Sequence, residues 1–114
     1  MAAPWRRIVR EQLELLASEN EQREYESNVP HVDITRELVC LWLGDSYHPD
    51  DRDFRSCFSD EELGALVQFN DILNARIDRL PPSNGTVEAW LASPEWREVM
   101  RAASEALQCM SDIS

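Results

Sequence analysis

The feature that most constrains the fold is a complete set of helix signals in residues 58–82. Ser59 and Glu62 have the spacing of a capping box, in which each side chain bonds the other residue's backbone N–H. Phe58 before the cap and Leu63 at the fourth helical position have the spacing of a hydrophobic staple. One face then recurs every three or four residues: Leu63, Leu66, Asn70, Leu73, Ile77 and Leu80. This pattern predicts a long amphipathic helix over 59–80, which two prolines end.

Two further helices are predicted near the ends of the chain. Pro4 suits a first-turn position, and Ser93 followed by Pro94 has the pattern of a cap and a first helical residue. Apolar residues at helical spacing follow each start. After Pro4 they are Trp5, Val9, Leu13 and Leu16, and after Pro94 they are Trp96, Val99, Met100, Ala103, Leu107 and Met110. A turn over 81–85 precedes a short helix that is predicted to begin at Thr86.

The segment after His31 allows two interpretations. Asp33 or Thr35 can cap a helix that Gly44 ends. In that helix four residues face inward: Ile34, Leu38, Leu41 and Trp42. The apolar run over 38–43 also suits a buried strand. The cap and the lack of a partner strand favour the helix.

Together these signals predict an all-α fold, a compact single-domain helical bundle over 1–114 with four main helices and one short helix. The stretch over about 18–30 is almost entirely polar and is expected to form a loop or a frayed helix end. Residues of about 44–58 are expected to form an acidic connector. No repeat or second domain is indicated.

Targeting signals are not evident. The longest apolar run, 38–43, falls far short of the ~20 residues that span a bilayer, and the first residues lack the apolar core of a secretory signal. The three cysteines include no CxxC pair, which is typical of reduced thiols. We therefore expect a cytoplasmic protein. All eleven basic residues are arginine, which GC-rich codons would produce and which favours a bacterial origin.

The net charge of −11 is concentrated in one part of the chain. Residues 11–62 carry fifteen acidic residues against four arginines, whereas residues 1–10 carry three arginines and no acid. A negative field repels phosphate backbones and attracts basic surfaces. Nucleic acids are therefore not expected as partners, and a basic protein is. A membrane is not expected either, because no apolar run is long enough to span one.

The acidic connector is the predicted binding surface. Aromatic anchors surrounded by charge can bind a protein partner, because aromatic side chains provide affinity and charges speed encounter. The residues predicted to bind the partner are Trp42, Asp45, Tyr47, Asp50, Asp51, Asp53, Phe54 and Glu61. The acids that begin the 59–80 helix also complement the helix dipole, which accounts for them without a partner.

Two alternatives remain open. His48 and the neighbouring aspartates could form the centre of a small metal-dependent or hydrolytic enzyme. Their spacing matches neither a zinc motif nor a calcium loop, and His31 with Asp33 is only one further local pair. Alternatively, the 59–80 helix, with Asn70 in its seam, could dimerise and serve as an adaptor or regulator.

The sequence contains no catalytic motif and no phosphate-binding glycine loop, so neither an enzyme nor a cofactor is expected. The favoured hypothesis is a non-enzymatic acidic protein, monomeric or homodimeric, that binds and neutralises or escorts a basic protein. An immunity protein or antitoxin directed against a basic toxin has this size and charge.

Overall fold

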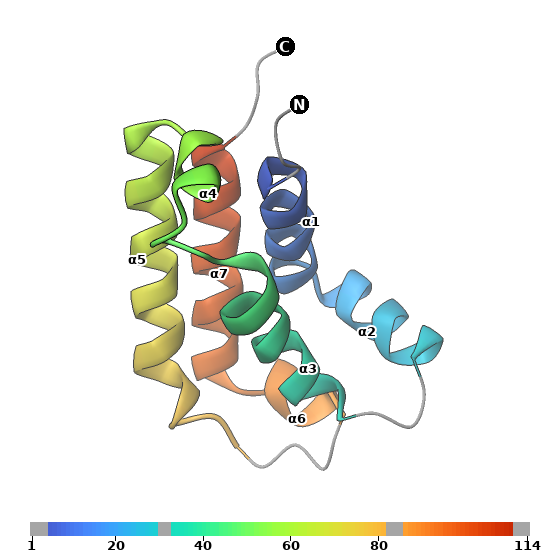
Figure 1. The fold of residues 1–114 in the computed structure, drawn as a ribbon. Coiled ribbons are helices and arrows are strands. Elements are labelled where there is room, and N and C mark those ends of the chain that lie inside the picture. Colours follow the sequence, from blue (N-terminus) through green and yellow to red (C-terminus); the bar gives the residue numbers. More distant parts are fainter. Residues whose placement is uncertain (1–4, 30–32, 82–85, 111–114) are drawn as a thin grey trace.

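The computed structural model describes residues 5–29, 33–81 and 86–110. Within these ranges the chain forms helices and no strand, which confirms the predicted all-α fold (Figure 1). The elements are α1 (Trp5–Ala17), α2 (Glu19–Asn28), α3 (Ile34–Cys40), η1 (Leu41–Ser46), α4 (Arg52–Ser56), α5 (Asp60–Ile77), α6 (Glu88–Leu91) and α7 (Pro94–Cys109). Compared with the prediction, α2 and α4 are additional helices. Pro4, His31 and most of the 81–85 turn lie outside the described residues.

The central element of the bundle is α7. It packs against α1 on one side and α5 on the other, and these three helices run side by side in Figure 1. Its buried face includes Trp96, Val99 and Ala103, as its spacing predicts. Leu107 is only partly buried, whereas the small residues Ala102 and Ala106 are buried. Short side chains on this face let neighbouring helices approach closely.

The start of α5 confirms the predicted capping box. The Ser59 hydroxyl accepts a hydrogen bond from the Glu62 backbone N–H at 3.1 Å, and the Glu62 carboxylate accepts one from the Ser59 N–H at 2.8 Å. The helix ends at Ile77, before the predicted limit of residue 80. The Asn70 side-chain oxygen accepts a hydrogen bond from the Trp42 indole N–H at 3.1 Å, and not one from a backbone group.

The ambiguous segment over 38–43 is helical. Asp33 caps α3 by accepting a hydrogen bond from the Arg36 N–H at 3.2 Å. Gly44 does not end the helix, because the chain widens into the π-helical turn η1, in which the Tyr47 N–H reaches the Trp42 carbonyl at 3.1 Å. The wider turn leaves Leu41 partly exposed and keeps the Trp42 side chain fully buried.

The expectation of a polar loop or frayed end over about 18–30 is wrong for most of that stretch. Residues Glu19–Asn28 form α2, which begins where the Ser18 hydroxyl accepts a hydrogen bond from the Glu21 N–H at 3.2 Å. Its single fully buried side chain is polar, Gln22, which bonds the Trp96 indole. Hydrophobic periodicity could not reveal this helix, because a hydrogen-bonding glutamine takes the place of an apolar stripe.

Two smaller predictions need adjustment. The short helix α6 begins at Glu88, after Val87, and not at Thr86. Ser93 occupies the cap position of α7 and Pro94 the first turn, as expected, but the Ser93 side chain makes no capping hydrogen bond. The expected acidic connector is also partly ordered, because it contains the end of η1 and all of α4, which Asp51 caps.

The middle of α5 offers a stability test at Gly64. A Cβ atom built there meets nothing within 4 Å, and the residue lies inside the helix. Glycine in a helix interior costs about 0.5–1 kcal/mol relative to alanine because it loses more backbone freedom on folding. We expect Gly64→Ala to raise the free energy of unfolding by that amount, measured by urea denaturation. A decrease would show that the site is more crowded than the structure indicates.

Candidate functional site

The predicted partner-binding residues divide into two groups. Asp45, Asp50, Asp51, Asp53 and Glu61 are exposed. Trp42 and Phe54 are fully buried in the hydrophobic core, so neither is available as an anchor at a surface. The burial of Trp42 confirms that it faces inward in its helix and contradicts its predicted role as a binding anchor, as the burial of Phe54 does for Phe54. Large aromatic side chains are buried wherever neighbouring helices can cover them.

The remaining aromatic residue of the predicted patch supports the core. The Tyr47 ring stacks on Trp42 with a centroid distance of 5.0 Å and contacts Phe54 edge to face at 5.8 Å. Burial raises the pKa of the Tyr47 hydroxyl, and the nearby Asp71 carboxylate raises it further. The exposed aspartates therefore surround an aromatic cluster that is largely covered.

His48 is held by packing and by one hydrogen bond. Its ring lies against Trp5 with a centroid distance of 4.9 Å, and Nε2 is 3.0 Å from the Asp45 carbonyl. Asp51, a proposed metal-site neighbour, accepts the Asp53 N–H at 2.8 Å as the cap of α4. Within residues 5–29, 33–81 and 86–110, no group of three or more His, Cys, Asp or Glu side chains is arranged to hold a metal ion. Cys40 and Cys109 are exposed, and the half-buried Cys57 thiol donates a hydrogen bond to the Asp53 carbonyl at 3.3 Å.

A more strongly acidic site lies between α1 and α2. These helices line an open groove of about 500 Å³. Its lining residues are Glu11, Glu14, Leu15, Glu21, Glu24, Tyr25 and Asn28. Four of them are glutamates and, in the described part of the chain, none is basic. Tyr25 and Leu15, both partly buried, add apolar surface to this acidic groove.

Electrostatic repulsion in the acidic groove is visible at Glu21. Burial raises the pKa of its carboxyl, and the charges of Glu14 and Glu24 raise it further. These three glutamates form no ion pair with any residue that the structure describes, and Glu11 is 3.6 Å from Arg7. Neighbouring negative charges mark a place where a positive charge would bind favourably.

The other side of α2 shows the opposite arrangement. Glu19 binds two guanidinium groups, with Arg97 Nη2 at 2.9 Å and Arg23 Nε at 3.2 Å. Those two hydrogen bonds lower the pKa of its carboxyl, which makes it more acidic than an isolated glutamate. Arg23 also reaches Glu88 at 2.7 Å. Two arginines therefore neutralise Glu19 on this side of α2.

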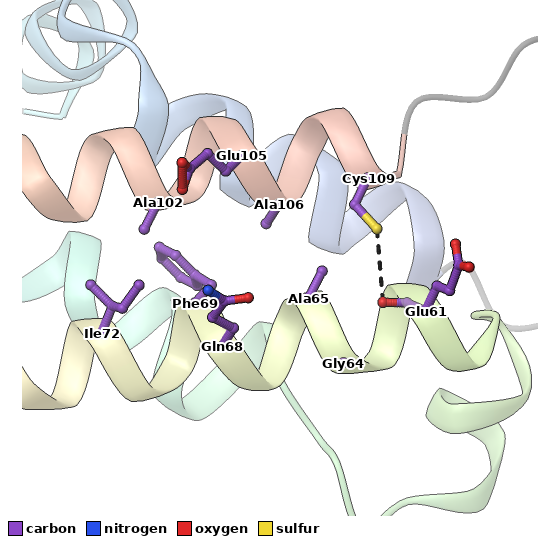
Figure 2. Close-up of a pocket in the computed structure, with 10 residues that line it drawn as sticks. All are labelled: Glu61, Gly64, Ala65, Gln68, Phe69, Ile72, Ala102, Glu105, Ala106 and Cys109. Carbon is purple, nitrogen blue, oxygen red and sulfur yellow. Dashed lines mark hydrogen bonds between the residues drawn. The ribbon is translucent and has the colours of Figure 1, made fainter.

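A second groove runs between α5 and α7, and its lining is less charged (Figure 2). The helices are antiparallel, since the Cys109 thiol lies 3.8 Å from the Glu61 carbonyl at one end and Arg76 pairs with Glu98 at the other. The groove has a volume of about 440 Å³. It is lined by Glu61, Gly64, Ala65, Gln68, Phe69, Ile72, Ala102, Glu105, Ala106 and Cys109.

Sequence reasoning missed the acidic groove although its signal is present. Glu21, Glu24, Tyr25 and Asn28 recur at spacings of three, one and three, which places them on one face of a helix. That signal is useful only once residues 19–28 are known to be helical. The position of this face beside Glu14 then depends on how α2 folds back on α1.

Within the described ranges, no helix is both long and apolar enough to cross a bilayer. In comparisons with known proteins, no family model matches the chain. No curated protein and no solved structure matches it either.

Proposed function

We propose that this chain is a non-enzymatic binding module that holds a basic protein partner, with the acidic groove between α1 and α2 as the contact site. The proposal rests on one observation. Four glutamates line this groove, and no basic residue in the described part of the chain lines it with them. Burial and the charges of Glu14 and Glu24 raise the pKa of Glu21, and a cation bound among these carboxylates would relieve the repulsion.

The groove suits an arginine or lysine side chain of a protein. The charged end of that side chain would lie among Glu14, Glu21 and Glu24, and its apolar stem would lie along Leu15 and Tyr25. A guanidinium group can also lie over the Tyr25 ring, which adds a cation–π contribution. The exposed Asp45, Asp50 and Asp53 extend the negative field and would speed encounter without forming the contact. Neutralising a basic toxin, as an immunity protein or antitoxin does, is one role for such a module.

The test compares two variants with the same change in charge. One carries Glu14→Gln, Glu21→Gln and Glu24→Gln, and the control carries Asp45→Asn, Asp50→Asn and Asp53→Asn. The probe is a fluorescent arginine-rich peptide, and its Kd is measured by anisotropy at several salt concentrations. We expect the groove variant to weaken binding by about tenfold or more, and the control variant to weaken it much less.

The groove variant should also be at least as stable as the wild type at neutral pH. Its substitutions remove a partly buried charge at Glu21 and the repulsion from Glu14 and Glu24, which together raise the pKa of Glu21. Equal loss of binding in both variants would mean that only net charge matters. A larger loss of peptide binding in the control variant would place the contact site at residues 45–53. Either result contradicts the proposal.

A further inference from the structure

We infer that a pocket between α3, η1, α6 and the end of α5 binds a small apolar molecule that carries one carboxylate. This inference goes beyond the proposed function and uses none of the residues of the acidic groove. The pocket has a volume of about 470 Å³, a size at which proteins hold small molecules. Five apolar side chains line this apolar pocket: Val39, Leu43, Ile77, Pro81 and Trp90.

Much of the apolar surface in this pocket is open to solvent. Leu43 is 41% exposed, and it is one of two large hydrophobic side chains that the described part of the chain leaves exposed. Ile77 and Pro81 are only partly buried. A ligand that lies against these three side chains removes apolar surface from water, which favours binding.

The wall of the pocket that α6 contributes is fixed before a ligand binds. The Trp90 indole N–H donates a hydrogen bond to the Pro81 carbonyl at 2.8 Å. The Trp90 ring also packs against Trp96, with a centroid distance of 4.7 Å. A wall that is already ordered loses little conformational entropy on binding, and this strengthens the complex.

The opposite wall has a polar end and an apolar end. Arg36, Val39, Cys40 and Leu43 recur at i, i+3, i+4 and i+7, which places them on one face of α3 and η1 (Figure 1). From residue 36 to residue 43 this face is roughly 10 Å long, at ~1.5 Å per residue. Leu43 belongs to the π-helical turn, a rare feature that is frequent at functional sites. The wall therefore suits an elongated ligand with its polar group near Arg36.

The charge of that polar group follows from the hydrogen bonds at the start of α3. Arg36 is exposed, and its guanidinium forms no ion pair with any residue that the structure describes. Asp33 also lines the pocket, but its Oδ1 atom already accepts hydrogen bonds from the Thr35 hydroxyl at 2.9 Å and the Arg36 N–H at 3.2 Å. A guanidinium with free donors binds a carboxylate through two parallel hydrogen bonds, so we assign a carboxylate to the ligand.

The net charge of −11 is compatible with this assignment. Exposed charges more than about 8 Å apart are largely screened at physiological ionic strength, so the groups beside the ligand decide its binding. Those groups are Arg36 and the hydrogen-bonded Asp33, in contrast to the four glutamates of the acidic groove.

The test compares three ligands that share one aromatic body. They are naphthylacetate, its neutral amide naphthylacetamide, and the cationic naphthylethylamine, and their Kd values are measured by calorimetry at about 0.15 M salt. We expect the acid to bind about tenfold more tightly than the amide and the amine.

The location of the bound acid is measured by the alkylation of two exposed thiols with iodoacetamide. Cys40 lines the apolar pocket, and Cys109 at the end of α7 does not. A saturating concentration of naphthylacetate should slow the alkylation of Cys40 by about tenfold and leave that of Cys109 unchanged.

Variants at exposed positions separate the two parts of the site. Arg36→Gln should weaken the acid by about tenfold and leave the amide unchanged, whereas Arg101→Gln, which removes an exposed charge outside the pocket, should change neither. Leu43→Asn should weaken the acid and the amide alike. Its control is Val67→Asn, at the other exposed hydrophobic residue, which does not line the pocket.

Several results would overturn the inference. Equal affinity for the acid and the amide would remove the role of Arg36, and tighter binding of the amine would make Asp33 the recognising group. An unprotected Cys40, or no binding of the acid at millimolar concentration, would remove the site. The neutralised variant of Glu14, Glu21 and Glu24 should bind naphthylacetate as the wild type does, so failure of the proposed function and failure of this inference are distinguishable.

Discussion

Replacing Gln22 with leucine is expected to lower the free energy of unfolding by about 2–4 kcal/mol. The Gln22 side chain is fully buried and joins three helices. Its Nε2 atom donates hydrogen bonds to the carbonyls of Leu15 and Leu16, both at 3.1 Å, and its Oε1 atom accepts one from the Trp96 indole at 3.0 Å. These carbonyls belong to the last turn of α1, where intrahelical donors run out. The Leu15 carbonyl also accepts a hydrogen bond from the Ser18 N–H at 3.4 Å.

Leucine has about the volume of glutamine, so the loss in Gln22→Leu comes from hydrogen bonding and not from a cavity. The Trp96 indole N–H and the Leu16 carbonyl would remain buried without a partner, and each such group costs more than the hydrogen bond itself contributes. Asn20→Leu, on an exposed part of α2, is the control and should change stability little. Urea denaturation with an unchanged m-value measures both variants.

A loss below about 1 kcal/mol in Gln22→Leu would show that water replaces the missing partners. The same variant also tests how the acidic groove is held together. Because Gln22 fixes α2, which carries Glu21 and Glu24, its loss should weaken binding of the arginine-rich peptide even under conditions where the protein remains folded. Unchanged binding would mean that α2 is positioned by other contacts.

Breaking the ion pair between Arg6 and Glu62 is expected to cost about 1–3 kcal/mol at neutral pH. The pair joins α1 to the start of α5 through two hydrogen bonds, 2.7 Å and 2.6 Å long, and the two side chains are only 30% and 12% exposed. Glu62→Gln removes the ion pair and keeps the capping box, because glutamine can also serve at the third helical position. Arg6→Ala removes the other partner.

The contribution of Glu62 depends on pH. The hydrogen bonds from Arg6 hold the pKa of its carboxyl below the usual range, although burial opposes this. Since the folded pKa lies below the unfolded value of about 4.3, the stabilisation is complete at neutral pH. It is lost as the pH falls below the unfolded value and through the folded pKa. The difference in unfolding free energy between wild type and Glu62→Gln should shrink over that range.

Arg7 provides the matched control for Arg6. It lies 3.6 Å from Glu11 on the same helix, but these side chains are 78% and 66% exposed. Solvent screens such a pair, so Arg7→Ala should leave stability nearly unchanged at any of these pH values. If Arg6→Ala were equally harmless, the junction of α1 and α5 would depend on apolar packing alone.

Sequence reasoning was most accurate where local chemistry decides structure. The start of α5 follows from the side chains of Ser59 and Glu62, and that of α7 from Pro94, because caps and prolines act within one turn of the chain. It was least accurate at α2, where the buried position is a glutamine. It also assigned Trp42 and Phe54 to a binding surface, although both are fully buried, because burial depends on residues far away in the sequence.

The helical class, the strongest helix starts and the excess of negative charge follow from the sequence alone, since all three depend on local spacing and composition. The place where that charge becomes a site depends on how the helices pack. The fold brings Glu14 of α1 beside Glu21 and Glu24 of α2, while Arg23 and Arg97 neutralise Glu19 on the opposite side. Electrostatic interactions depend on distance in space, and the packing of helices sets those distances.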